Sequence, residues 1–285
     1  MGLRDTLSRI RVALRKTGEI YRNGGVCYAS ISTPVYGKIL SGKNILITGG
    51  SSGIGLEIAK RSLSCGATVV ITGRNEAKLK EAANSLHSVN CQYLVWDVSN
   101  LTILGKKLEE CDQLLSGDID ILVNNAGIAP TKFFGGVDEE EWHRIYDINL
   151  KGNYFLTQAL VSKWKNNIPT KEYKRIINIS SQGGFVGATY PYRMTKWDIR
   201  GLTEGLGKLL FKDRIIVNGI APGVVKTSMQ EFSLQQGDNL YTNQNLIERV
   251  ILPEEIAEVA LFLMSGASNA IVGQTIVCDG GYTLK

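Results

Sequence analysis

The sequence predicts an α/β fold in which one parallel, doubly wound sheet of about seven strands carries helices on both faces. Short β-branched runs alternate with helical apolar periodicity from Lys43 almost to the end of the chain, as in parallel strands joined by helices. A glycine-rich turn joins the first strand to the first helix, and polar residues follow later strands. In sheets of this class, ligands bind at the carboxyl ends of the strands.

The strands are expected where Val, Ile and Thr cluster between glycine, asparagine or charged residues. In chain order they are Ile45–Thr48, Ala67–Thr72, Gln92–Val98, Ile119–Val123, Ile176–Ile179, Ile215–Ile220 and Thr275–Cys278. Helices are expected between them because apolar residues recur every three or four positions there. Their expected ranges are 54–64, 75–87, 101–115, a long helix opened by Asp138, 191–211 and 253–264. Asp138, with Glu141 three residues on, matches a helix N-cap with a capping box.

Length and composition limit the alternatives. The 285 residues, 44% of them hydrophobic, can bury one large core without a second domain. Five cysteines without a Cys-x-x-Cys pair indicate neither a disulfide framework nor a metal site and favour a reducing, cytoplasmic setting. No apolar run approaches the roughly 18 residues of a spanning helix, and no secretion signal is recognisable.

The net charge of +5 lies in residues 1–40, where seven basic groups face two acidic ones, so the body of the chain is neutral. We expect no nucleic-acid partner, because enzymes of nucleic acids carry basic surface on the folded domain. We divide the chain into a basic extension, 1–40, and a single catalytic domain, 41–285. Within residues 1–20, apolar positions at helical spacing predict a basic amphipathic helix. These positions are Leu3, Leu7, Ile10 and Leu14. Peripheral membrane contact, packing on a partner subunit and a partly ordered extension all agree with this pattern.

The stretch Lys43–Leu56 predicts a phosphate site at the first strand-to-helix turn. Glycines let the backbone turn sharply and approach an anion, and the N–H groups at a helix start favour negative charge. A glycine-rich loop without a ligand is the alternative. The residues expected to contact the ligand here are Gly49, Ser51, Ser52, Gly53, Ile54 and Gly55.

Further residues occur at the ends of later strands on the same edge. Asp97 ends the third predicted strand and Asn124-Asn125-Ala126-Gly127 the fourth. With the glycine turn and Tyr192-x-x-x-Lys196, they make residues 42–282 resemble the short-chain dehydrogenase/reductase family. The Gly49-x-x-x-Gly53-x-Gly55 spacing favours this family over dehydrogenases with the Gly-x-Gly-x-x-Gly form.

The resemblance implies a Rossmann-type fold, a nicotinamide dinucleotide and hydride exchange between a ketone and a secondary alcohol. By the same resemblance, Asp97 and Val98 would contact the adenine end of the cofactor. The backbone of Asn125, Ala126 and Gly127 would pass beside the cofactor, while Asn124 would brace the sheet.

The end of the second strand bears on which dinucleotide binds. A site for NAD usually places a carboxylate there, whereas this chain has Thr72-Gly73-Arg74 with no acid before Glu76. Arg74 could pair with a 2′-phosphate, which a carboxylate would repel. We therefore expect NADP(H) rather than NAD(H). The alternative is that Arg74 only faces solvent at a turn.

Acid/base chemistry is expected further along the chain. Tyr192 and Lys196 are four residues apart, so a helix places the phenol and the ammonium on one face. A nearby lysine and an oxidised nicotinamide would both favour phenolate and lower the pKa of Tyr192. Ser180-Ser181 ends the fifth strand, where a hydroxyl could donate to a carbonyl oxygen. Asn149 is a polar amide in an apolar helical stripe, and a buried amide needs partners.

The resemblance assigns roles to this set. Asn149 would hold a water in a proton relay through Lys196, which would also bind the nicotinamide ribose. Ser181 would orient the carbonyl and Tyr192 would be the acid/base. Because the segment up to Tyr192 is shorter than is common in the family, Ser180 is the alternative hydroxyl.

Beyond the sixth strand, the resemblance places the backbone and side chains of four residues beside the nicotinamide: Pro222, Gly223, Val225 and Thr227. The next 25 residues, polar with scattered apolar side chains, would form a substrate lid. Asp279-Gly280-Gly281 resembles a subunit contact, so we expect a homodimer or homotetramer.

The function expected is therefore NADP(H)-dependent interconversion of a small-molecule ketone and a secondary alcohol, with a 3-oxoacyl thioester as one candidate substrate. A steroid, a sugar or another secondary alcohol is the alternative within the family, and a non-catalytic NADP-binding regulator is the alternative outside it. Several basic residues could dock an acidic carrier protein, or could be a solvated face: Lys171, Lys174, Arg175, Lys208, Lys212 and Arg214.

Overall fold

The computed structural model describes residues 10–11, 14–15, 17–18, 25–29, 36–166, 172–227 and 239–284. Within them, seven strands form one sheet in which every neighbouring pair is parallel. The strands are β1 (Asn44–Thr48), β2 (Thr68–Gly73), β3 (Cys91–Val95), β4 (Ile121–Asn124), β5 (Lys174–Ile179), β6 (Ile215–Pro222) and β7 (Thr275–Cys278). Their spatial order is β3-β2-β1-β4-β5-β6-β7, which confirms the predicted doubly wound sheet. The order reverses between β1 and β4, so ligands are expected at the carboxyl ends of these two strands.

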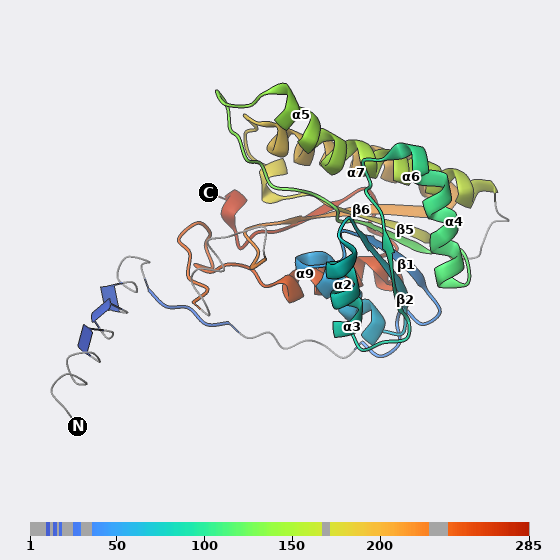
Figure 1. The fold of residues 1–285 in the computed structure, drawn as a ribbon, viewed down its shortest axis with the longest axis horizontal. Coiled ribbons are helices and arrows are strands. Elements are labelled where there is room, and N and C mark those ends of the chain that lie inside the picture. Colours follow the sequence, from blue (N-terminus) through green and yellow to red (C-terminus); the bar gives the residue numbers. More distant parts are fainter. Residues whose placement is uncertain are drawn as a thin grey trace.

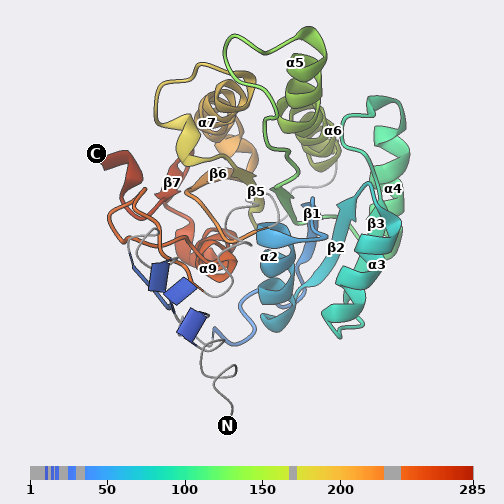
Figure 2. The same ribbon diagram turned by 60° about the vertical axis from the view of Figure 1, so that its left-hand side comes forward.

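Helices cover both faces of this sheet (Figure 1). On one face lie α4 (Leu104–Leu115), α5 (Glu139–Tyr146), α6 (Gly152–Asn166) and α7 (Pro191–Leu210). On the other lie α2 (Gly53–Ser64), α3 (Glu76–Ser85) and α9 (Pro253–Met264). The view in Figure 2 shows α2 and α9 next to each other, and these two helices are in contact.

Each face of the sheet has its own hydrophobic core. Ile45 and Ile47 of β1 belong to the cluster beneath α2 and α9, whereas Leu46 belongs to the cluster beneath α4 and α6. This alternation follows from the two-residue period of a strand. All three side chains are fully buried, and burying each contributes roughly 1.5–3 kcal/mol. The two cores thus fix the strands whose ends form the site.

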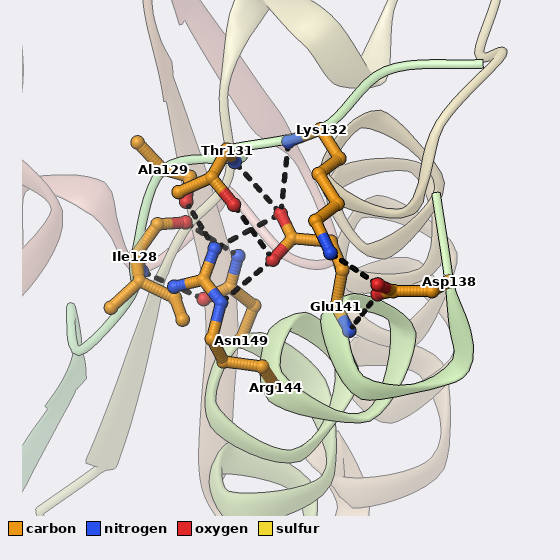
Figure 3. A network of polar contacts seen from close by, with 8 residues as sticks. All are labelled: Ile128, Ala129, Thr131, Lys132, Asp138, Glu141, Arg144 and Asn149. Carbon is orange, nitrogen blue, oxygen red and sulfur yellow. Dashed lines mark hydrogen bonds and ion pairs between the residues drawn. The ribbon is translucent and has the colours of Figure 1, made fainter. Parts of the chain in front are cut away.

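Side-chain caps fix where helices begin. The Asn75 side chain accepts from Lys78 N at 3.0 Å, and the Asp138 side chain accepts from Glu141 N at 2.9 Å. The predicted N-cap at Asp138 is confirmed, but the capping box is wrong because the Glu141 carboxylate points elsewhere. It accepts hydrogen bonds from Thr131 and Arg144, as Figure 3 shows.

The long helix after Asp138 is interrupted by one π-helical turn. This turn, Asp147–Lys151, lies between α5 and α6. It carries Asn149, which is fully buried. A π turn widens the helix locally and is frequent at functional sites.

The amino-terminal extension touches the domain before its predicted end. Leu40 is buried in the core beneath α2. Ile10 and Leu14, two apolar positions of the predicted amphipathic helix, have helical backbone and are exposed, while Leu3 and Leu7 lie outside the described residues. In the described part of the chain, no helix has the length and apolar character needed to cross a bilayer.

Candidate active site

The glycine turn between β1 and α2 lies directly against the end of β4. Gly49 and Gly53 have φ of +65° and +54°, in the left-handed region that favours glycine. A Cβ on Gly49 would lie 2.9 Å from Ala126 Cα, and one on Gly53 would lie 2.9 Å from the Thr227 methyl group. Three predicted site segments therefore meet at van der Waals distance here.

Gly55, in the first turn of α2, leaves room for the side chain of Asn125, which directly follows β4. Its Cβ would lie 2.5 Å from Asn125 Nδ2. That amide donates to Thr48 O at 3.0 Å and to Gly49 O at 2.9 Å. The Thr48 hydroxyl in turn accepts from the N–H groups of Asn125 and Ala126, each at 3.0 Å. The Asn125 side chain thus holds the turn in place.

The first turn of α2 begins without a side-chain cap. Ser52 is the N-cap residue, with extended backbone, and its side chain makes no cap hydrogen bond. The N–H groups of a first helical turn favour an anion, so this end of α2 fits a phosphate. Ser51 lies on the β2 side of the turn, since a Cβ on Gly73 would be 3.6 Å from Ser51 Oγ.

The residues predicted for the adenine end of the cofactor follow β2 and β3. Arg74 is exposed immediately after β2. Asp97 is half-buried after β3, and its Oδ1 accepts from Ser99 N and Ser99 Oγ at 2.9 and 2.6 Å. Val98 is buried beside Gly152, whose Cβ would lie 2.5 Å from Val98 O. These strand ends are on the same edge as the glycine turn.

A cavity of about 390 Å³ continues from the glycine turn past the end of β5. Most of the residues predicted for the nicotinamide end and the chemistry line it. They are Ile54, Asn125, Gly127, Ser181, Tyr192, Lys196, Pro222, Gly223, Val225 and Thr227. Among the described residues, no cluster of His, Cys, Asp and Glu is arranged to hold a metal ion.

Asn149 lies behind Gly127. Its Oδ1 accepts from Ile128 N at 2.8 Å and its Nδ2 donates to Ile128 O at 3.1 Å. A Cβ on Gly127 would lie 3.4 Å from Asn149 Oδ1 and 3.7 Å from Lys196 Nζ. The amide and the amine therefore approach the same point from two helices.

The two serines after β5 have different environments. Ser180 is buried, and its hydroxyl donates to the Lys196 backbone carbonyl at 2.8 Å. The Ser181 oxygen accepts from Gly183 N at 3.1 Å and also forms a hydrogen bond with the Tyr192 side chain. The Ser181 hydroxyl thus lies beside the phenol, while that of Ser180 is engaged by the backbone of α7.

The comparisons with known proteins agree with this geometry. A protein family described as "Enoyl-(Acyl carrier protein) reductase" matches residues 49–283. This chain belongs to the short-chain dehydrogenase/reductase family. It is accordingly an oxidoreductase that uses a nicotinamide cofactor.

Individual relatives of this short-chain dehydrogenase/reductase are similar over most of its length. The 3-oxoacyl-[acyl-carrier-protein] reductase FabG of Aquifex aeolicus (strain VF5) is 35% identical over 85% of this chain and 98% of its own length. The solved 3-ketoacyl-(acyl-carrier-protein) reductase from Brucella melitensis, complexed with NADH, has 29% identity and a TM-score of 0.77, covering 86% of this chain and 99% of its own. A Pseudomonas aeruginosa RhlG/NADP complex has 29% identity and a TM-score of 0.79, covering 88% and 100%.

Asn124 braces the sheet of this family member, as predicted. Its Nδ2 donates to Thr157 Oγ1 and to Asn178 Oδ1, both at 2.9 Å. Asn178 Nδ2 donates in turn to Thr203 Oγ1 at 3.0 Å. This chain of buried hydrogen bonds links α6, β4, β5 and α7 within the sheet that carries the site.

The pKa values of the two central groups are set by burial. Burial raises the pKa of Tyr192, a hydrogen bond with Ser181 opposes this, and Tyr190 raises it further. Burial lowers the pKa of Lys196 to about 8. Its Nζ donates to Ile179 O at 3.0 Å and lies 5.6 Å from the centre of the Tyr192 ring. The protein's own groups therefore do not lower the pKa of Tyr192 as predicted, because desolvation of the phenolate is the largest influence on it.

One wall of the dehydrogenase cavity was missed in the sequence. Phe133 and Tyr190 pack edge to face with centroids 5.0 Å apart, and the Arg193 guanidinium lies 5.4 Å from the Tyr190 ring centre. All three line the cavity. Phe133 and Tyr190 come from loops, where neither strand nor helix periodicity applies, so no signal in the sequence indicated them.

Proposed function

We propose that this enzyme is an NADP(H)-dependent carbonyl reductase that converts a 3-oxoacyl thioester to the corresponding secondary alcohol. One observation carries the proposal: the hydroxyls of Ser181 and Tyr192 and the amine of Lys196 line the same cavity. This cavity opens beside a glycine turn that fits a dinucleotide phosphate. A binding module has no need of a phenol with a lysine alongside it.

The strand ends supply a cradle for an extended dinucleotide. Arg74 and Asp97 would hold its adenosine end, the start of α2 its phosphates, and Lys196 the ribose next to the nicotinamide. Glycine at positions 49 and 53 lets the turn approach Ala126 and Thr227 closely, because a Cβ at either position would lie 2.9 Å from its neighbour. When bound, the nicotinamide supplies the hydride that reduces the carbonyl carbon.

The protein's own groups then manage the carbonyl oxygen and its proton. Ser181 donates to the oxygen as negative charge develops there, and Tyr192 donates its proton to the same oxygen. A phenol whose pKa is raised stays protonated at neutral pH, which suits donation. Lys196, with a pKa of about 8, can pass a proton back to the phenolate, and Asn149, which approaches the same point at Gly127, would hold an intervening water.

Arg74 supports NADP(H) as the preferred cofactor. It is an exposed cation at the end of β2, where no described acidic side chain precedes it on the strand. The Kd for NADPH divided by that for NADH should be below one and should approach one in Arg74→Ala. Lys80→Ala, which removes another exposed cation from α3, should leave the ratio unchanged. A ratio above one in the unaltered protein refutes the preference.

The substrate class rests on relatives and on the cavity wall. Several curated relatives are named 3-oxoacyl-[acyl-carrier-protein] reductases, and the wall near Tyr192 includes apolar side chains such as Pro130, Phe133 and Val224. The test is NADPH oxidation with 3-oxoacyl thioesters, steroids, quinones and keto-sugars. Fastest turnover of the thioesters is expected. Preference for another class refutes the substrate assignment, and no turnover of any class refutes the reductase assignment.

We further infer that the enzyme is a homo-oligomer. An aromatic face formed by α5, α6 and α7 has four partly exposed side chains: Trp142, Tyr154, Phe155 and Trp197. A hollow runs between these helices, and a second copy would cover it. The Asp279–Gly281 turn predicted as a subunit contact packs on Leu246 and Ile247 of its own chain. Phe155→Glu should therefore lower the sedimenting mass, whereas Phe262→Glu on α9 should not.

A further inference from the structure

We propose that residues 25–29 form a positioning segment, which holds one wall of the substrate cavity and thereby sets the affinity for the carbonyl substrate. This proposal rests on the proposed reductase function. The segment belongs to the amino-terminal extension, and the family match begins only at residue 49. This support for the cavity wall therefore comes from outside the matched residues.

The positioning segment pairs with the chain that leads out of the predicted lid. Cys27 N donates to Asn239 Oδ1 at 3.0 Å, and Asn239 Nδ2 donates to Gly25 O at 3.1 Å. Leu240 N donates to Cys27 O at 2.9 Å. These hydrogen bonds join parts of the sequence more than 200 residues apart, with a separation of 212 for Cys27 and Asn239. One asparagine side chain thus ties the extension to the domain.

The same hydrogen-bonded ladder continues to the cavity. Val250 N donates to Leu240 O at 2.8 Å, which brings in the next segment. Ile251 N then donates to Val224 O at 2.8 Å, and Lys226 N donates to Ile251 O at 2.9 Å. Val224 lines the cavity. Four short segments, beginning with the positioning segment, therefore lie side by side up to the cavity wall.

Apolar packing follows the same path. Val224, Leu240 and Val250 form a small buried cluster separate from the two main cores, and Ala29 of the positioning segment packs against it. Leu240 and Val250 are 4% and 1% exposed. Loss of the positioning segment would uncover this cluster and leave Leu240 N without its acceptor, Cys27 O. The Val224 wall would then be less well ordered for an apolar substrate chain.

The phosphate end of the cofactor cradle lies apart from this ladder, although the ladder includes Val225 at the nicotinamide end. Gly49, Asn125 and the start of α2 are held by β1 and β4 and by one another. Disturbing the positioning segment should therefore raise the substrate KM by a larger factor than the NADPH Kd. This separation distinguishes a positioning role from a general loss of stability.

The test uses the full chain with Asn239→Leu, which removes both side-chain hydrogen bonds to the segment. The KM for a long-chain 3-oxoacyl thioester should rise by as much as about 30-fold, because the two lost hydrogen bonds contribute about 1 kcal/mol each, while the NADPH Kd rises by a smaller factor. Asn239→Asp keeps the acceptor for Cys27 N and should give a smaller rise. Asn90→Leu, an exposed asparagine before β3, is the matched control and should change neither value.

Hydrogen exchange supplies a readout that needs no turnover. In Asn239→Leu, the amides of residues 248–251 should exchange faster while those of β1 and β4 do not change. An unchanged KM, or a KM and an NADPH Kd that rise in the same proportion, overturns the proposal. If the unaltered enzyme reduces no carbonyl, the proposed function fails, and unchanged exchange at 248–251 then refutes the positioning segment separately.

Discussion

Replacing Gly55 by alanine tests whether the glycine turn is held by direct contact with Asn125, which follows β4. The new Cβ would lie 2.5 Å from both Asn125 Nδ2 and Gly49 O, so these atoms must move by about 1 Å to reach ordinary contact. The movement breaks or weakens the two hydrogen bonds of Asn125 Nδ2, at about 1 kcal/mol each. Overpacking destabilises the protein by a further 1–3 kcal/mol, roughly, and the better helix propensity of alanine offsets about 1 kcal/mol of this loss.

The net loss in free energy of unfolding for Gly55→Ala is therefore about 2–4 kcal/mol. Urea denaturation at 25 °C measures it, and fluorescence titration should show a raised NADPH Kd. The matched control is Gly205→Ala in α7, because that exposed helical position has no neighbour within 4 Å. The control should gain roughly 0.5–1 kcal/mol. If Gly55→Ala gains stability as Gly205→Ala does, with an unchanged NADPH Kd, the packing argument is refuted.

Three further predictions concern individual side chains. Ser181→Ala should lower kcat more than Ser180→Ala, and the reverse order would assign the substrate hydroxyl to Ser180. Glu141→Gln should cost about 1–3 kcal/mol at pH 7 by urea denaturation, because the buried carboxylate loses its charge toward Arg144. Arg144 lowers the pKa of Glu141 to about 2, so the difference in stability between Glu141→Gln and the unaltered protein should shrink as pH falls from about 4.5 toward 2. The exposed control Glu139→Gln should be as stable as the unaltered protein. A loss in Glu141→Gln that does not depend on pH contradicts the role of the Glu141 charge. Lys196→Met should be more stable than the unaltered protein at pH 7, by on the order of 2–3 kcal/mol, because a buried ammonium is removed. The unaltered protein gains stability as pH rises from about 8 toward the ordinary lysine pKa, so the difference in stability between it and Lys196→Met should narrow over this range. A difference that widens refutes the buried ammonium as its cause.

The sheet was predictable because its strands are long apolar runs with clear ends. Thr275–Cys278 and 253–264 were predicted at their observed bounds, since proline or glycine lies close to each start. The other strands differ at their ends by a few residues, as for Gln92–Val98 against Cys91–Val95. Position along the sheet edge then brought the cofactor-binding candidates together, because parallel strands end on one side.

The features that the sequence did not predict depend on the direction in which individual side chains point. Glu141 has the spacing of a capping box, yet its carboxylate satisfies the Thr131 and Arg144 donors instead. Asn149 sits in a π turn, and one extra residue in a helix leaves no periodic signal. Arg175 is buried and bonded to Ser268 and Asn269, so it cannot belong to a docking surface for a carrier protein.

Long-range pairing was also beyond the sequence. Nothing in the composition of residues 25–29 predicted their contact with Asn239. The predicted lid begins after Thr227, and residues 228–238 lie outside the described part of the chain. The Tyr192 pKa likewise depends on how deeply the phenol is buried, which a four-residue spacing cannot state.

The central claim, that Tyr192 is the acid of a carbonyl reductase, is tested most directly by removing one oxygen atom. In Tyr192→Phe, kcat for NADPH-dependent reduction of a 3-oxoacyl thioester should fall about 10²–10⁴-fold with an unchanged NADPH Kd. Tyr190→Phe is the matched control, because Tyr190 lines the same cavity and should retain most of the turnover. A Tyr192→Phe enzyme that turns over at close to the unaltered rate would contradict the account.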